Sequence, residues 1–263
     1  FFLFSEEHQQ FITTRNFYYK KTSLVAFSMS GTGSDHELLT TKQKSLSLPQ
    51  SIKVYYWDFP FWRAEVLRAG LFLQGIPFEN VTDNEKIDVL KSKGLIPFGA
   101  LPVLEIDGKI LSQTQACATY IGKLGNLYPS NDDILAQANC DEIINGCTDV
   151  TNTIASTFRI PKDDVKEARE KLVDPETGRL MKHLKGLNSI VCQDGSEYAC
   201  GKACGLTVAD LAVWRLVAWF NGGNLDHINP DLVISFANLK AISENVAKNE
   251  KIQEYQKLYY PEA

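Results

Sequence analysis

Residues 96–114 read IPFGALPVLEIDGKILSQT, and this stretch decides the fold of the first part of the chain. An Asp-Gly pair at 107–108 separates two apolar runs, which is a strong pattern for a β-hairpin. We therefore predict antiparallel strands over 103–106 and 109–111. The residues that follow, 113–124, are predicted to form a helix.

The segment before the hairpin predicts a strand, a helix and a second strand. Residues 52–57 are β-branched and aromatic, as strand residues are. Apolar residues at helical spacing follow over 63–74, Gly75 ends that helix, and 77–81 form a short strand. Residues 84–93 are charged and are interpreted as one irregular helix. A βαβ unit followed by a ββα unit makes a small α/β domain with a mixed sheet.

Beyond a linker at 128–132 the sequence carries hardly any strand pattern, and the chain continues as a predicted all-α bundle. Its helices are expected over 134–158, 163–190, 207–220 and 238–259. We place the α/β domain at 51–127 and the helical domain at 132–263. Residues 1–50 are expected to be a disordered tail, or else a targeting or over-extended segment, in which 1–28 fits an organelle transit segment.

Composition limits the class of protein. The 263 residues are 44% hydrophobic, which suffices for a sizeable core. Lysine and arginine total 27 against 32 aspartates and glutamates, so the net charge of -5 offers no basic surface to nucleic acid or an anionic membrane. No apolar run is long enough to span a bilayer. We therefore expect no nucleic-acid partner and no membrane partner.

Six cysteines are present, and none belongs to a C-x-x-C pair. A chain of this length does not need disulfides, so we interpret them as reduced thiols in the cytoplasm, or in an organelle if 1–28 is a transit segment. Cys200 and Cys204 have no second Cys/His pair nearby, and no metal is expected. Cys117 lies inside a predicted helix, which disfavours a cysteine-based oxidoreductase.

Two places in the α/β domain are suited to hold a ligand. At the head of a central strand, a cis bond from Leu101 to Pro102 would turn main-chain groups outward to grip a peptide, whereas a trans bond would mark an edge strand. Gln113 and Thr114 begin a helix, whose free N–H groups attract a carboxylate. The alternative is that Thr114 is only an N-cap. A capping-box pattern at 207–210 starts a buried helix and is assigned no catalysis.

Tyr56 ends the first strand just before the turn into a helix. A phenol there can donate a hydrogen bond to a substrate thiolate and favour the ionised sulfur. The alternative is that Tyr55 and Tyr56 both pack in the sheet. Arg63 follows in the first turn of the helix, where a bound thiolate or Glu65 would offset its charge, unless it is simply solvated.

Taken together, these segments resemble the cytosolic glutathione transferases, most closely the sigma-like class that includes the glutathione-dependent prostaglandin D synthases and the lens S-crystallins. The resemblance spans residues 51–258. It implies a thioredoxin-like first domain with a four-stranded mixed sheet, an all-α second domain, and homodimers. It rests on residues 53–56 with 63–68, on 97–108 with 112–114, and on 206–210, in this order and spacing.

The resemblance also implies roles for single residues. Tyr56 would activate the glutathione thiol, and Arg63 would support the thiolate. The other glutathione contacts would be made by the main chain of Leu101 next to cis-Pro102, by Gln113 and Thr114 at the γ-glutamyl carboxylate, by Lys93 at the glycyl carboxylate, and by Asp141 reaching the partner subunit's glutathione.

The chain departs from the family pattern directly after the tyrosine pair. The loop at 58–62 is one residue longer than usual and has no glycine, so Tyr55 stays open as the thiol-activating residue. The implied reaction is conjugation of glutathione, as co-substrate, to an apolar electrophile, or a glutathione-dependent isomerase or peroxidase reaction, without a metal. The alternative is a non-catalytic glutathione- or ligand-binding relative of the crystallin kind. Candidates to line the electrophile pocket are Phe59, Phe61, Trp62 and Phe158.

Overall fold

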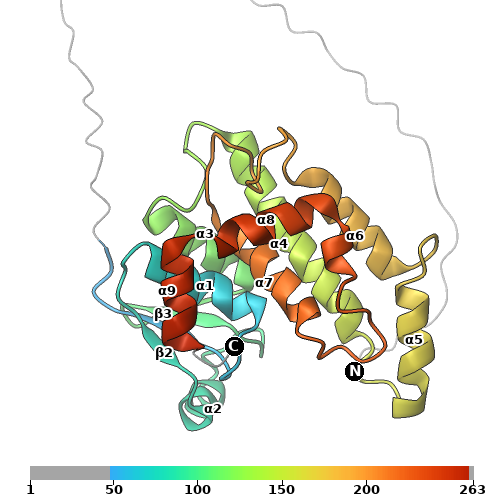
Figure 1. The fold of residues 1–263 in the computed structure, drawn as a ribbon. Coiled ribbons are helices and arrows are strands. Elements are labelled where there is room, and N and C mark those ends of the chain that lie inside the picture. The colour runs from blue at the N-terminus through green and yellow to red at the C-terminus, as the bar shows by residue number, and fades with distance from the viewer. Residues whose placement is uncertain (1–47, 261–263) are drawn as a thin grey trace, which may run out of the picture. The chain divides into compact units, whose positions relative to one another are not determined.

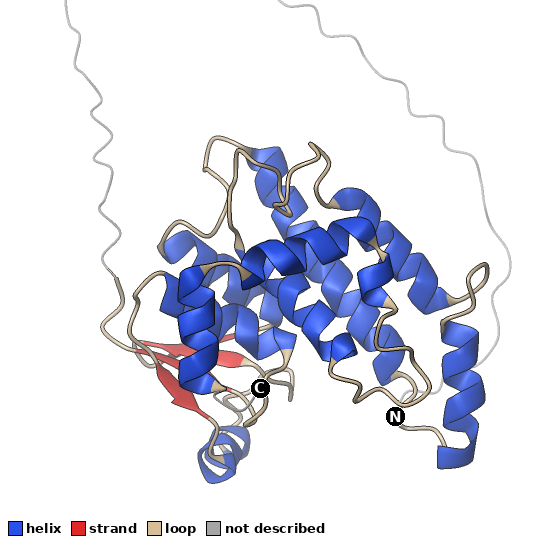
Figure 2. Cartoon of the chain, viewed as in Figure 1, coloured by secondary structure: helices blue, strands red, loops and turns tan. Residues whose placement is uncertain are grey.

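The computed structural model describes residues 48–260, which begin with a four-stranded mixed sheet (Figure 1, Figure 2). β1 runs parallel to β2 and antiparallel to β3, and β3 runs antiparallel to β4. The strands are β1 (Ile52–Tyr55), β2 (Glu79–Val81), β3 (Val103–Ile106) and β4 (Lys109–Ser112), in the spatial order β2-β1-β3-β4. The accompanying helices are α1 (Trp62–Leu73), α2 (Asn84–Ser92) and α3 (Thr114–Leu124). This part of the chain has the predicted thioredoxin-like fold.

The strand register brings three distant segments to one edge of the sheet. Tyr55 pairs with Val103, and Val103 pairs with Ser112. Because both pairings are antiparallel, the end of β1, the start of β3 and the end of β4 lie side by side. The residues that continue from this row at the same edge are Tyr56, Pro102 and Gln113.

The second part of the chain is helical, as predicted. Its helices are α4 (Ile134–Ala155), α5 (Val165–Leu172), α6 (Arg179–Ile190), α7 (Val208–Asn221), α8 (Ala237–Ala247) and α9 (Glu250–Tyr259), with short 3-10 turns at Lys162–Asp164 and Val233–Ser235. The predicted helices 163–190 and 238–259 are each wrong as single elements, because turns divide them, and the first of these turns contains Pro175 and Gly178, which disfavour a continuous helix. Asp174 accepts two backbone N–H groups in the turn between α5 and α6, and Asn249 does the same at the start of α9. Short polar side chains compete with the helix for backbone groups, which helical periodicity does not reveal.

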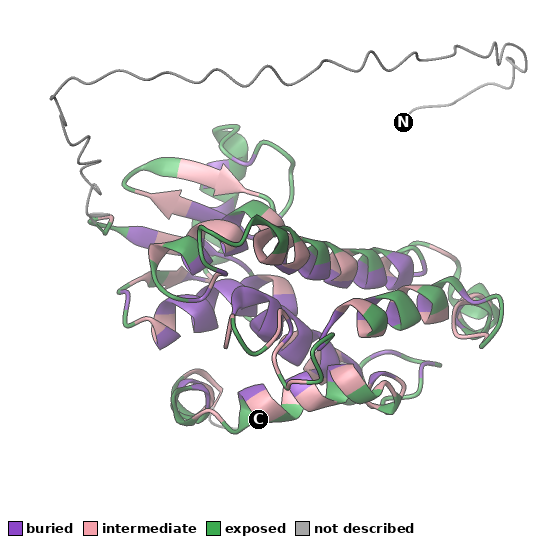
Figure 3. Ribbon diagram, turned by 90° about the horizontal axis from the view of Figure 1, so that it is seen from above, coloured by how far each residue is buried: buried purple, intermediate pink, exposed green. Residues whose placement is uncertain are grey.

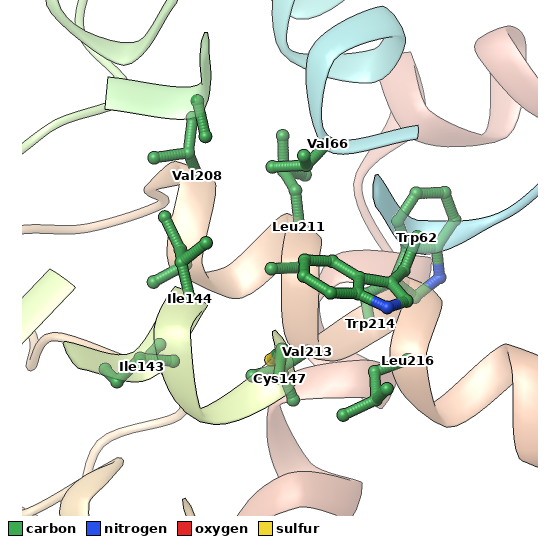
Figure 4. Packing of buried hydrophobic residues seen from close by; sticks show 14 of the residues in the cluster. Trp62, Val66, Ile143, Ile144, Cys147, Val208, Leu211, Val213, Trp214 and Leu216 are labelled. Carbon is green, nitrogen blue, oxygen red and sulfur yellow. The ribbon is translucent and has the colours of Figure 1, made fainter. Parts of the chain in front are cut away.

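One hydrophobic core joins the sheet to the helices (Figure 3, Figure 4). Helix α7 runs through this core and is apolar nearly all round, as a buried helix is. Trp62 of α1 is fully buried in it, and its indole N–H donates to Thr151 Oγ1 of α4 at 2.7 Å. Helix α7 begins with the predicted capping box of Thr207 and Asp210. The hydrogen bond from Trp62 to Thr151 anchors the start of α1, which follows the loop after Tyr56, to the helical part of the chain.

The predictions for the first 47 residues, and with them most of the predicted tail 1–50, lie outside the described residues. The domain limits 51–127 and 132–263 stay predictions; the sheet with α1 to α3 falls inside the first range and α4 to α9 inside the second. Among residues 48–260, no helix is both long and apolar enough to cross a membrane.

Candidate active site

The sheet edge formed by β1, β3 and β4 carries main-chain groups that are free to pair with a ligand. The Leu101–Pro102 peptide bond is cis, so the first of the two predicted alternatives is the one observed. Within residues 48–260, the N–H and C=O groups of Leu101 have no hydrogen-bond partner. An extended peptide can pair with such groups as an added strand does.

Next along the same edge, helix α3 begins with N–H groups that have no partner among the described residues. Its first backbone bond runs from Cys117 N–H to Gln113 C=O, which leaves the N–H groups of residues 114–116 without helical acceptors. Gln113 has φ 75° and ψ 122°, which residues other than glycine rarely adopt, and its side chain is exposed and makes no cap bond. The N-cap is therefore Gln113 rather than Thr114, and the helix start is open to an anionic group.

Hydrogen bonding distinguishes the two adjacent tyrosines, which belong to the same buried cluster. The Tyr55 hydroxyl donates to Glu105 Oε2 at 2.8 Å, and Lys53 Nζ pairs with Oε1 of the same carboxylate at 3.1 Å. Burial and the Glu105 carboxylate raise the pKa of Tyr55. The Tyr56 hydroxyl has no hydrogen-bond partner in the part of the chain that the structure describes. Tyr56 is therefore the tyrosine whose hydroxyl is available to a ligand.

Two arginines set the electrostatics at Tyr56. Burial raises the pKa of the Tyr56 phenol above its ordinary value, and the charges of Arg63 and Arg68 lower that pKa again in part. The phenol is therefore protonated at neutral pH and acts as a hydrogen-bond donor rather than as a base. A thiolate that accepts this hydrogen bond would lie near the charge of Arg63, which favours the ionised sulfur, whereas the charge of Arg68 is paired with Glu65.

Arg63 has no counter-ion among the described residues. Its Nη2 donates to Asn152 Oδ1 of α4 at 3.0 Å, while its Nε is buried without a hydrogen-bond partner. Burial lowers the pKa of this guanidinium, and the nearby Tyr56 opposes the effect. The predicted partner, Glu65, pairs with Arg68 instead. A buried N–H of a cation is costly to leave unsatisfied, and a bound anion would satisfy it.

The chain matches both domains of one protein family. Residues 52–123 match the family model of the glutathione S-transferase N-terminal domain, and residues 148–258 match that of the C-terminal domain. The chain belongs to the glutathione S-transferase family. Glutathione S-transferase 1 of Ascaris suum is 29% identical over 211 residues, which are 79% of this chain and 96% of that relative. Glutathione S-transferase alpha-1 of Rattus norvegicus is 27% identical over 195 residues, 73% of this chain and 82% of the relative. The solved structure of prostaglandin synthase D of Nilaparvata lugens superimposes with a TM-score of 0.64, at 26% identity over 79% of this chain and 97% of that one.

In this glutathione S-transferase, the predicted glycyl ligand Lys93 lies beside a hollow that Tyr55 lines and Tyr56 does not. It is the C-cap residue of α2 and lines a hollow together with Tyr55 and Glu105. None of the other predicted site residues lines that hollow. Lys93 therefore shares no hollow with the other predicted glutathione ligands, and its role as the ligand of the glycyl carboxylate stays a prediction.

The predicted cross-subunit ligand Asp141 is hydrogen bonded within its own chain. Its Oδ1 accepts hydrogen bonds at 2.6, 3.0 and 2.7 Å from the side chains of Gln115, Thr119 and Tyr128. These bonds fasten α4 to α3 and to the linker after it. A contact with the partner subunit's glutathione stays a prediction and would use Oδ2.

Two arginines that the sequence alone leaves without a role hold the loop at 57–60. Arg68 donates to the carbonyl oxygens of Trp57 and Phe59 at 3.2 and 3.4 Å. Arg215 donates to the carbonyl oxygen of Pro60 at 3.0 Å. A signal for Arg68 exists in the sequence, since it stands three residues after Glu65 on the same helix. Arg215 leaves no such signal, because nothing local relates α7 to this loop.

An aromatic surface adjoins Tyr56. The rings of Trp57, Phe59 and Phe61 surround that of Tyr56, with centroid distances of 5.0, 5.5 and 6.5 Å, respectively. Trp57 is 41% exposed and Phe59 is 46% exposed, so this surface is open to an apolar ligand. Of the predicted pocket candidates, Trp62 is fully buried in the core and is excluded.

The cysteines offer no reactive thiolate beside Tyr56. All six are unpaired. Burial raises the pKa of Cys117 to about 12, and its thiol donates to the carbonyl of Leu111 at 3.4 Å. Residues 48–260 contain no group of three or more His, Cys, Asp or Glu side chains placed to hold a metal.

Proposed function

We propose that this protein is a glutathione transferase that ionises the glutathione thiol and directs it at an apolar electrophile. The observation that carries the proposal is the Tyr56 hydroxyl, which has no hydrogen-bond partner among residues 48–260. It lies near Arg63 and Arg68 at the same sheet edge as the main chain of Leu101, which is likewise unpaired in the described residues. Membership of the family supports the same reaction type. Isomerisation or peroxide reduction by a glutathione thiolate would use the same groups.

Glutathione would lie extended along the sheet edge. Its cysteinyl part would pair with the main chain of Leu101 beside Pro102. Its γ-glutamyl carboxylate would bind at the open start of α3, where Gln113 and Thr114 add side-chain donors. Lys93, at the end of α2, is proposed for the glycyl carboxylate.

The reaction needs no covalent bond to the protein. The thiol releases its proton to solvent, and the sulfur remains as a thiolate that accepts the Tyr56 O–H and is stabilised by the charge of Arg63. The thiolate attacks a carbon of the electrophile; the S–C bond forms while the leaving group departs with its electron pair. Trp57 and Phe59 would contact the apolar part of this electrophile.

Within the family we infer a sigma-like member that works as a homodimer in the cytoplasm. The similarity to the prostaglandin synthase D structure supports the class. The unpaired thiols fit a reducing compartment. In the dimer, Asp141 would reach the partner subunit's glutathione with its second carboxylate oxygen.

The proposed function is tested by mixing the purified protein with glutathione and an activated aryl chloride. We expect saturable conjugation well above the uncatalysed rate. If glutathione binds and no conjugation exceeds that rate, the protein is the non-catalytic glutathione-binding alternative. If glutathione does not bind, it is a structural relative of the crystallin kind.

Gln113→Ala is expected to weaken glutathione binding by about ten-fold or more, because a hydrogen bond to a charged group contributes about 1.5–3 kcal/mol. Isothermal titration calorimetry measures the dissociation constant. The pKa of the bound thiol should not change, since Gln113 is proposed to contact the γ-glutamyl carboxylate and not the cysteinyl part that carries the thiol. Gln253→Ala on α9 is the matched control, as among residues 48–260 its amide donates only to the nearby carbonyl of Ala247. If the Gln113 and Gln253 variants bound glutathione with equal affinity, Gln113 would not be a glutathione ligand.

Tyr55→Phe is expected to leave the pKa of the bound thiol unchanged. The substitution removes the hydrogen bond to Glu105 and should lower the free energy of unfolding by about 1 kcal/mol. Urea unfolding checks the stability, and ultraviolet titration of bound glutathione checks the thiol. A rise of the thiol pKa in this variant, with none in Tyr56→Phe, would make Tyr55 the activating residue.

A further inference from the structure

A buried ion pair between Glu65 and Arg68, which takes no direct part in the proposed reaction, lies next to the ring of Tyr56. Glu65 and Arg68 of α1 are 0% and 1% exposed, and their charged atoms approach to 3.1 Å. A buried ion pair is stable only when its remaining donors and acceptors are also hydrogen bonded. The partners that complete this pair come from opposite ends of the described chain.

On one side, the C-terminal helix completes the carboxylate. Helix α9 packs against α1 (Figure 1). The Tyr255 hydroxyl donates to Glu65 Oε2 at 2.9 Å, and the Tyr260 hydroxyl donates to Glu65 Oε1 at 2.6 Å. Both carboxylate oxygens are therefore fixed by phenols of the last turns of the described chain.

On the other side, the guanidinium holds the environment of the thiol-activating tyrosine. Its Nε donates to Asn80 Oδ1 at 2.8 Å, and its two terminal nitrogens donate to the carbonyls of Trp57 and Phe59. Its Cζ lies 5.8 Å from the ring centroid of Tyr56. Arg68 thus fixes both the ring and the loop that follows it, a loop without a glycine.

We propose that the Glu65–Arg68 pair, held by the hydroxyls of Tyr255 and Tyr260, is a positioning element that sets the Tyr56 hydroxyl for ionisation of the glutathione thiol; this rests on the proposed function. The Tyr255 and Tyr260 hydroxyls donate to the carboxylate of the pair, Arg68 Nη1 also donates to the Tyr260 hydroxyl at 3.4 Å, and the guanidinium lies against the Tyr56 ring. The two phenols stabilise the carboxylate, so the guanidinium is not drawn away from the Tyr56 ring. The docking of α9 would in this way control the acidity of a thiol that it does not touch.

The experiment removes only the two hydroxyls, in the full chain, with the double substitution Tyr255→Phe and Tyr260→Phe. We measure the pKa of bound glutathione by ultraviolet difference absorbance, and the dissociation constant of S-methylglutathione, which has no ionisable thiol. The thiol pKa should rise by about one unit, which corresponds to a coupling of ordinary size. S-methylglutathione should bind as it does to the wild type, because Leu101 and the start of α3 are untouched.

Tyr259→Phe is the matched control, since the Tyr259 hydroxyl is on the same helix and makes no hydrogen bond in the described part of the chain. If the double variant does not fold, Tyr260→Phe alone, at the half-buried end of α9, should show a smaller shift in the same direction. A wild-type thiol pKa that both variants retain would overturn the positioning element and leave the proposed function intact. An unshifted thiol in the wild type itself would overturn the proposed function, and this inference with it.

Discussion

Replacing Tyr56 by phenylalanine is expected to lower kcat/KM for glutathione conjugation by about a hundred-fold at neutral pH, the usual cost of losing one donor to a developing negative charge. The hydroxyl is the only group removed. The ring keeps its contacts with Trp57, Phe59 and Phe61 and its place under Arg68, so the fold should not change. Steady-state kinetics with glutathione as the varied substrate measure the loss.

The pH dependence of the Tyr56→Phe variant distinguishes thiol activation from a binding effect. The rate of the variant should recover as pH rises toward the ordinary pKa of a free thiol, about 8.5, because the thiolate then forms without help. The wild type should already have reached its plateau at lower pH. Loss of activity at every pH, together with weaker binding of S-methylglutathione, would contradict the assigned role. The matched control is Tyr55→Phe, which removes a hydroxyl from the neighbouring residue.

Replacing Asp210 by alanine is expected to lower the free energy of unfolding by about 4 kcal/mol, near the top of the range for single substitutions. The Asp210 side chain is fully buried. Its Oδ1 accepts Ala199 N–H at 2.7 Å, and its Oδ2 accepts the N–H and hydroxyl of Thr207 at 2.8 and 2.7 Å. The substitution leaves these donors buried and unsatisfied at the start of α7, the helix that runs through the core. Urea unfolding measures the change.

Asp133→Ala provides the matched comparison for this prediction. Asp133 also caps a helix, accepting Ala136 N–H at 2.9 Å, but it does so at the exposed start of α4. Its loss should cost about 1 kcal/mol, as for an ordinary N-cap. If the two substitutions lowered the free energy of unfolding equally, burial of the α7 capping box would not add to the stability of the protein, which would contradict the prediction.

The sheet and the edge that carries the candidate site could be predicted because each step depends on local pattern. The Asp-Gly turn fixes the register of its own hairpin, and that register places Pro102 next to Gln113. Pairing of β1 with β3 then adds Tyr56 to the same edge. The start of α3 was identifiable from its position directly after a strand, although the residue that caps it is Gln113 and not Thr114.

The choice between the tyrosines and the network behind Tyr56 could not be predicted, since both depend on contacts between distant segments. Tyr55 is engaged by Glu105, which stands 50 positions later. Glu65 is engaged by phenols 190 and 195 positions later, on a helix whose docking has no local signature. The same limit applies to Arg215, whose contact with the loop at 57–60 spans 155 positions.

The most direct test of the account is the thiol pKa of glutathione bound to the wild-type protein, measured by ultraviolet difference absorbance across pH. The unpartnered Tyr56 hydroxyl beside Arg63 and Arg68 predicts a pKa about two units below that of free glutathione. A bound thiol with the pKa of free glutathione would contradict the account and leave a glutathione-binding protein of the same fold without the chemistry of a transferase.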